Sequence, residues 1–189
     1  MNVAAFASQA AFRAAMEAFA RPGEIHSIRG VAAPRPLMPA TAALVQTLAD
    51  YETPVWLDAA LAREPAVADW VRFQTGAPIA REPGAAAFAL IGDSLALPDF
   101  AQFALGSEEY PDRSATLLVQ VRSFSGPRLR LEGPGIKGAR SLAAEPLPAD
   151  FVERLAANRA LFPRGVDLLL IAGDEVAALP RSLHVSRDG

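Results

Sequence analysis

The residues best suited to chemistry are a serine, two aspartates and a histidine, in the order found in α/β-hydrolases. Ser94 follows an apolar segment within Gly-Asp-Ser-Leu-Ala, which half-matches the turn that exposes a nucleophilic serine; Asp167 or Asp174, then His184, complete the order. Such a turn requires a long helix directly after the serine, and Pro98 would disrupt it. The sequence leaves two alternatives, an independent serine hydrolase or a turn in which an aspartate caps its own backbone.

Metal-binding and thiol groups are sparse. The chain has no cysteine, which excludes disulfides and thiolate catalysis, and its two histidines, His26 and His184, lack partners at ligand spacing. Asp93 and Asp174 each follow a strand-like segment and a glycine, so they would pair if those strands were neighbours; turn capping is the other interpretation. We therefore expect no metal site.

Positive charge gathers in one part of an otherwise acidic chain. Between residues 122 and 140, a single acidic residue, Glu132, accompanies five basic ones: Arg122, Arg128, Arg130, Lys137 and Arg140. A solvated hairpin face would explain the pattern, and so would a surface for an acidic partner or a phosphorylated ligand. Arg21, which precedes Pro22-Gly23, and Arg181, which follows Pro180, are further candidate anion contacts.

The basic residues surround an alternating segment, Arg128–Glu132, that runs into Gly133-Pro134-Gly135. Alternation predicts a strand with its two leucines on one face and its charged side chains on the other. With Gly138 the glycines match the G-x-G-x-x-G dinucleotide fingerprint, but that motif needs a helix, and residues 137–142 show no helical apolar period. We therefore interpret Gly133, Pro134 and Gly135 as a structural or interface loop.

The elements that would position these residues alternate between strands and helices. Strands are predicted at 24–28, 54–57, 86–91, 115–121, 128–132, 166–172 and 183–186. Helices are predicted from Ser8 with Phe12, Met16 and Phe19 inward, from Thr41 to Leu48, from Pro65 to Gly76, and from Pro148 to Asn158. This order predicts one α/β domain over residues 1–189, a sandwich with a central mixed sheet of roughly six or seven strands flanked by helices.

Composition narrows the classes of function. The formal charge is −3, so nothing global favours nucleic-acid binding. No segment approaches the roughly 18 uninterrupted apolar residues of a membrane span, and the N-terminus lacks a signal pattern. We expect a soluble, cytoplasmic protein with neither a nucleic-acid nor a membrane partner.

A set of short motifs, taken in order, resembles the PhnH family, the H subunit of the bacterial carbon–phosphorus lyase system. The motifs cover almost the whole chain: Phe12-Arg13, Ala20-Arg21-Pro22-Gly23, Leu48 through Asp50 to Trp56-Leu57, Arg72-Phe73-Gln74-Thr75-Gly76-Ala77, Phe88-Ala89-Leu90, Tyr110-Pro111, Ser114-Ala115-Thr116, Gly133-Pro134-Gly135-Ile136, Phe162-Pro163, Gly165-Val166-Asp167 and Leu179-Pro180-Arg181. Gln74 departs from the pattern, because a histidine is expected there.

The resemblance implies a subunit of the complex that forms ribose 1-methylphosphonate 5-triphosphate from ATP and methylphosphonate in alkylphosphonate catabolism. Its implied partners are subunits G, I and J, with nucleobase displacement assigned to subunit I and radical carbon–phosphorus cleavage to the iron–sulfur subunit J. A structural or organising role remains for this chain, with a homodimer expected when it is isolated.

The resemblance also implies a fold similar to the large domain of pyridoxal-phosphate-dependent transferases. That cofactor needs a desolvated lysine, and Lys137, the only lysine, lies in a glycine-flanked loop. We therefore expect no pyridoxal phosphate and no other cofactor.

Overall fold

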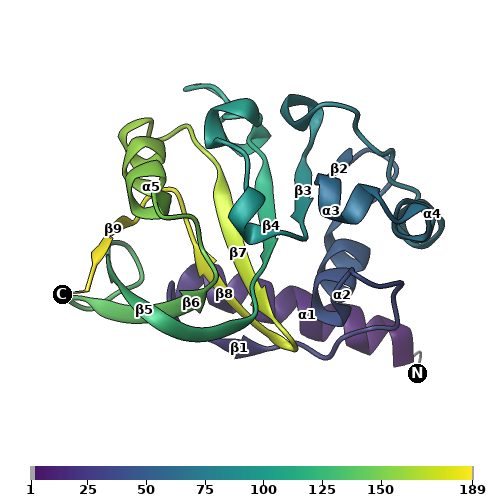
Figure 1. Ribbon diagram of the computed structural model, residues 1–189, viewed down its shortest axis with the longest axis horizontal. Helices are drawn as coiled ribbons and strands as arrows, with labels where there is room; N and C mark the ends of the chain where they lie inside the picture. Colours follow the sequence, from purple (N-terminus) through teal and green to yellow (C-terminus); the bar gives the residue numbers. More distant parts are fainter. Residues whose placement is uncertain (1–2, 189) are drawn as a thin grey trace.

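The computed structural model describes residues 3–188, which form an α/β fold with two sheets (Figure 1). Within this range the larger sheet has six strands in the order β1-β8-β7-β4-β3-β2. β2, β3, β4 and β7 run parallel, whereas β8 pairs antiparallel with both β7 and β1, so the sheet is mixed as expected. Its strands are β1 (His26–Ser27), β2 (Val55–Leu57), β3 (Phe88–Ile91), β4 (Thr116–Gln120), β7 (Asp167–Ala172) and β8 (Glu175–Leu179).

The centre of the larger sheet is apolar on both faces. Every residue of β7 after Asp167 is buried, and so is every residue of β4 after its first. Continuous buried runs of this kind are typical of parallel strands covered on both sides. Alternate side chains enter two cores, since Leu118 and Leu169 pack into one and Leu117 and Leu168 into the other.

Within residues 3–188, four helices cover one face of this sheet: α1 (Val3–Ala20), α2 (Pro39–Leu48), α3 (Ala59–Ala62) and α4 (Pro65–Thr75). The opposite face is covered by α5 (Phe151–Ala160) and the smaller sheet. In Figure 1, α5 lies to the left of β7, and α1 and α2 lie below and to its right. α4 follows its sequence signals, because Pro65 occupies the first turn and Gly76 ends the helix in the left-handed conformation at φ 74°.

The basic hairpin belongs to the smaller sheet and not, as the sequence analysis expected, to the central one. This sheet has the order β6-β5-β9 and is antiparallel throughout. Leu129 and Leu131 are buried and Arg128 and Arg130 exposed, as alternation predicted. A register shift between Ser123 and Arg128 marks a bulge, which bends the hairpin. The strands are β5 (Ser123–Glu132), β6 (Arg140–Glu145) and β9 (His184–Arg187).

α1 buries a different face from the one predicted. Phe12 and Met16 are 49% and 51% exposed and Phe19 is only partly buried, whereas the buried positions among residues 7–20 are alanines, Ala11, Ala14, Ala15 and Ala18. Both sets share the helical period, so periodicity does not distinguish them. Ser8 lies inside the helix and does not cap it. No described helix, α1 included, is long and apolar enough to cross a membrane.

One smaller prediction is also wrong, and one strand was not predicted. Thr41 does not cap α2: Met38 holds the cap position with Pro39 in the first turn, and Thr41 is buried. β8 was not predicted as a strand, because its sequence Glu-Val-Ala-Ala-Leu contains alanines of weak strand propensity. Its identity as a strand depends on pairing with β7 and β1.

Candidate functional site

Ser94 is held in a turn at the carboxyl end of β3. Its Oγ donates to the carbonyl oxygen of Pro146 at 2.7 Å, and the residue is buried. It begins a single 3-10 turn in which the Asp93 carboxylate accepts from the backbone N–H of Leu95 at 3.1 Å. The turn-capping interpretation of Asp93 is confirmed.

The other members of the hydrolase triad lie elsewhere. Asp167 begins β7, in register through β4 with Phe88 at the start of β3, whereas Ser94 follows the end of β3. At about 3.3 Å per residue, Asp167 and Ser94 lie on the order of 20 Å apart. His184 is exposed on β9, opposite Glu132 in the smaller sheet. Asp167 and Ser94 therefore do not belong to one triad.

The carboxylate pair does not form either. Asp93 follows β3 and Asp174 follows β7, and β4 lies between these two strands. Asp174 instead lies in the β7–β8 turn, where its carbonyl oxygen accepts from the N–H of Ile28 at 2.7 Å. Among residues 3–188, no group of three or more His, Cys, Asp or Glu side chains could hold a metal ion.

Arg181 is fully engaged inside the protein. Its Nε and Nη2 pair with the carboxylate of Asp167 at the start of β7. Nη1 donates to the carbonyl oxygens of Pro111 at 2.8 Å and Pro163 at 3.3 Å, and Nη2 also donates to Ser114 Oγ at 2.5 Å. Because all five N–H donors have acceptors, the guanidinium joins residues 111–114 to residues 163–167 and has no donor left for an anion.

Asp58 is an organising residue that the sequence analysis missed. It is 4% exposed, and one carboxylate oxygen caps α3 by accepting from the N–H of Leu61 at 2.9 Å. The other accepts from the N–H groups of Gly92 and Asp93, each at 2.9 Å. An aspartate just before a short helix is a recognisable cap signal, but its link to the β3 turn depends on tertiary structure.

Residues 20–24 and residues 133–140 lie in direct contact, although they are more than a hundred residues apart in the sequence. Gly135 has φ 82°, and a Cβ there would meet the Ala20 carbonyl oxygen and lie 2.9 Å from Pro22 Cδ. Gly23 has φ 78°, and a Cβ there would lie 2.6 Å from Leu131 Cδ1. Gly135 therefore requires glycine for conformation and for space, and Gly23 favours glycine for its conformation. We call residues 20–24 with residues 133–140 the glycine junction.

Arg140 fastens the glycine junction. Its Nη1 donates to the carbonyl oxygens of Pro22 at 2.9 Å and Arg21 at 3.4 Å, and its Nη2 pairs with Glu24 at 2.8 Å. The Arg21 guanidinium itself is exposed and lies 3.2 Å from Glu17 on α1. Arg140, grouped by sequence with the basic hairpin face, thus has an internal role.

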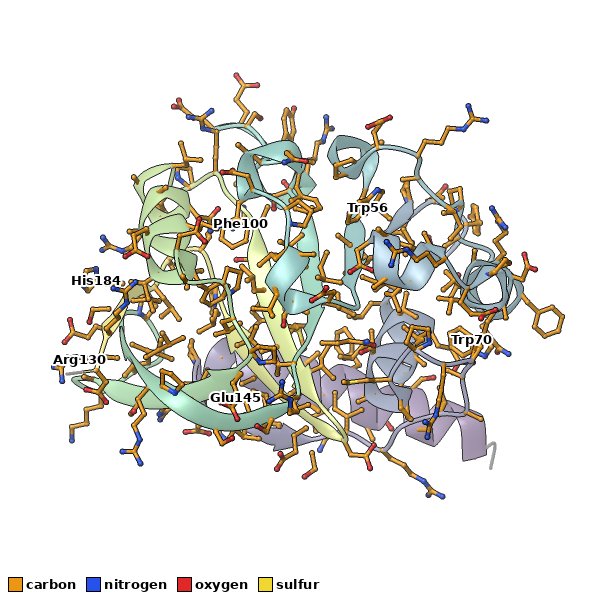
Figure 2. All side chains as sticks on the ribbon, viewed as in Figure 1. Trp56, Trp70, Phe100, Arg130, Glu145 and His184 are labelled. Atoms are coloured by element: carbon orange, nitrogen blue, oxygen red, sulfur yellow. The ribbon has the colours of Figure 1, made fainter. Side chains whose placement is uncertain are left out.

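Arg128, Arg130 and Lys137 are exposed. Arg128 and Arg130 are exposed on the outer face of β5, and Arg130 pairs with Glu132 at 2.8 Å. Figure 2 shows Arg130 at the outer edge of the molecule, on the side away from Trp70. Within residues 3–188, no acidic side chain lies within 4 Å of the Arg128 or Lys137 charge. We call Arg128, Arg130 and Lys137 the basic face.

Gln74 lies on α4, far along the chain from the basic face. Its Oε1 accepts from Nε2 of Gln46 on α2 at 2.9 Å. Both side chains line a small cavity of about 270 Å³ with Arg29 and Trp70. An amide therefore forms an interhelical hydrogen bond at the position where a histidine was expected.

Comparison with known proteins is consistent with these motifs. Residues 2–186 match the sequence model of a family described as bacterial phosphonate metabolism protein (PhnH). The chain belongs to the PhnH family. It is 44% identical over 185 residues to the alpha-D-ribose 1-methylphosphonate 5-triphosphate synthase subunit PhnH of Rhizobium meliloti (strain 1021), covering 97% of this chain and 92% of that protein. It is also 42% identical over 86 residues to the putative C-P lyase subunit protein HtxG of Stutzerimonas stutzeri, covering 45% of this chain and 44% of that one.

Proposed function

We propose that this PhnH-family chain is a non-catalytic, organising subunit of a carbon–phosphorus lyase complex, in a synthase that forms ribose 1-methylphosphonate 5-triphosphate. The relatives named as a synthase subunit and a C-P lyase subunit support membership of such a complex. Subunits G, I and J are the proposed partners, with a homodimer in their absence and a cytoplasmic location. We also propose that the fold of this chain is similar to the large domain of pyridoxal-phosphate-dependent transferases.

The glycine junction is the observation that carries the organising role. Its motif residues form a close backbone contact, which Arg140 reinforces by donating to the Pro22 carbonyl oxygen. The junction joins the end of α1 to the tip of the β5–β6 hairpin, and so holds the hairpin in one position. A held hairpin presents the basic face without the entropic cost of ordering a loop on association.

The basic face suits an acidic surface on a partner. Arg128 and Lys137 have no internal ion pair within residues 3–188, and the Arg130–Glu132 pair is exposed and therefore weak. Exposed charges at an interface mainly increase the association rate and oppose wrong partners, and both effects diminish with salt. Assembly that uses this face should therefore depend on ionic strength.

Co-purification tests the proposal directly. Tagged chain co-expressed with subunits G, I and J should retain at least one of them. Arg128→Glu with Arg130→Glu should reduce that retention, most strongly at low salt. The matched control, Arg13→Glu with Arg63→Glu, makes the same change of formal charge at exposed positions on α1 and after α3. Equal retention by both double variants across a salt series would show the basic face to be merely solvated.

A further inference from the structure

A cavity lies outside the glycine junction. It measures about 560 Å³ and lies between the smaller sheet and the first turn of α5. This volume is within the range of roughly 300–1,000 Å³ found for small-molecule sites. Its apolar lining includes Leu129 from β5, Leu147 from the β6–α5 connection, and Phe151 and Val152 from α5.

Hydrogen bonds and two prolines restrict the backbone that forms one wall of this cavity. The connection that forms one wall reads Pro-Leu-Pro-Ala, so two prolines restrict its backbone. The Pro146 carbonyl oxygen accepts from Ser94, and the Ala149 carbonyl oxygen accepts from Arg187 Nη2 at 2.9 Å. Ser94 therefore has a structural role, because its hydroxyl group holds one wall of the cavity.

Positive charge exceeds negative charge in the lining. Three arginines line the cavity, Arg122, Arg128 and Arg187, against two acids, Glu145 and Asp188. Glu145 is already engaged, because its Oε1 accepts from Ser125 at 3.0 Å and from Ser123 at 3.4 Å. Arg187 pairs with Glu153 at 2.9 Å, but both side chains are more than half exposed, so that pair is weak. Within the described range, no acidic side chain lies within 4 Å of the Arg122 or Arg128 guanidinium.

We propose that this cavity binds a small organic anion, an apolar body that carries one carboxylate or phosphate group. The apolar body would lie on Leu147 and Val152, where its burial is favourable. The anionic group would meet Arg122, because a guanidinium fork matches the oxygens of both carboxylate and phosphate. Arg128 belongs to both the cavity lining and the basic face, whereas Arg122 belongs only to the cavity, so Arg122 distinguishes this inference from the assembly proposal.

Binding to the full-length chain tests this with four probes, measured by isothermal titration calorimetry and ligand-observed NMR. Phenyl phosphate and benzoate combine an arene with an anion, benzyl alcohol lacks the charge, and inorganic phosphate lacks the apolar body. We expect saturable one-to-one binding of at least one arene anion, roughly tenfold tighter than benzyl alcohol and inorganic phosphate. Which arene anion binds more tightly distinguishes a phosphate ligand from a carboxylate one.

Variants locate the site. Arg122→Glu changes an exposed residue, so the chain should fold, and it should weaken binding of the arene anion by roughly tenfold or more. Val152→Trp should fill the cavity and abolish binding. Arg130→Glu, an equal charge change on an arginine outside the cavity, should leave binding unaltered.

Three results would overturn the proposal. They are failure of both arene anions to saturate at millimolar concentrations, equal binding of all four probes, and binding unchanged in both Arg122→Glu and Val152→Trp. If instead Val152→Trp abolished co-purification of the partner subunits while no probe bound, the cavity would be a docking groove for protein.

Discussion

Replacing Gly135 with alanine should destabilise the chain through the glycine junction. The backbone there has φ 82°, a conformation that costs an L-residue about 1–2 kcal/mol. The new Cβ would also meet the Ala20 carbonyl oxygen and lie 2.9 Å from Pro22 Cδ. Backbone and a proline ring yield little, so this contact should cost about a further 1–3 kcal/mol. Together the two effects predict a loss of about 2–5 kcal/mol.

Gly138 supplies a matched control in the same hairpin. Its φ of 77° is almost the same, but a Cβ there would meet no atom within 4 Å. Gly138→Ala should therefore show only the conformational cost, about 1–2 kcal/mol. The smaller entropy of the unfolded alanine chain, worth about 0.4–1 kcal/mol, applies to both variants and cancels in their difference.

Urea denaturation measures both variants, with the free energy of unfolding taken from the midpoint at constant slope. Gly135→Ala should unfold at the lower urea concentration, and its melting temperature should fall by at least about 4 °C for a chain of this size. Equal destabilisation of the two variants would show that the close contact between Gly135 and residues 20–24 does not stabilise the fold. The proposed organising role of the glycine junction would then be wrong.

The other predictions concern single side chains. Ser94 should not react with serine-directed fluorophosphonates, and stoichiometric labelling lost in Ser94→Ala would contradict the turn assignment. Arg181→Lys should lower the free energy of unfolding by at least about 2 kcal/mol, because lysine cannot replace a five-donor fork in a mostly buried pair; denaturation midpoints test this. The hydrogen bond from Arg154 lowers the pKa of Asp150 below its usual 3.8. Above pH 3.8 the ionised Asp150 therefore stabilises the fold slightly, and this stabilisation is lost as the pH falls. Asp150→Asn should remove this pH dependence, which melting temperatures measured across a pH series would show. Added pyridoxal phosphate should give no aldimine band at about 330–430 nm, and a borohydride-trapped adduct on Lys137 would refute this.

Elements with strong local signals could be predicted from sequence. β3, β4 and β7 are short continuous apolar runs, and all three are buried strands close to the expected ranges. α4 was predicted by Pro65 at its start and Gly76 at its end, which act within their own turns. The alternation of β5 also identified its buried and exposed faces. In each case the determining interactions lie within a few residues.

Choices between equivalent local patterns could not be predicted. The alanine face and the Phe12–Met16 face of α1 have the same period, and only packing against β8 and α2 selects the alanines. β8 became a strand through its partners on both sides, which outweighed its weak propensity. The triad residues occur in hydrolase order, yet parallel strand register puts Asp167 and Ser94 at opposite ends of the sheet.

Local signals in the sequence suffice for most of the strands, the limits of α4 and the family. Tertiary structure alone decided what the Gly133–Gly135 loop contacts, that Arg140 and Arg181 are engaged internally, and that Arg122 and Arg187 line one cavity. The difference follows from distance along the chain. Propensity, capping and periodicity act over a few residues, whereas these contacts join segments dozens of residues apart that meet only after the two sheets have packed.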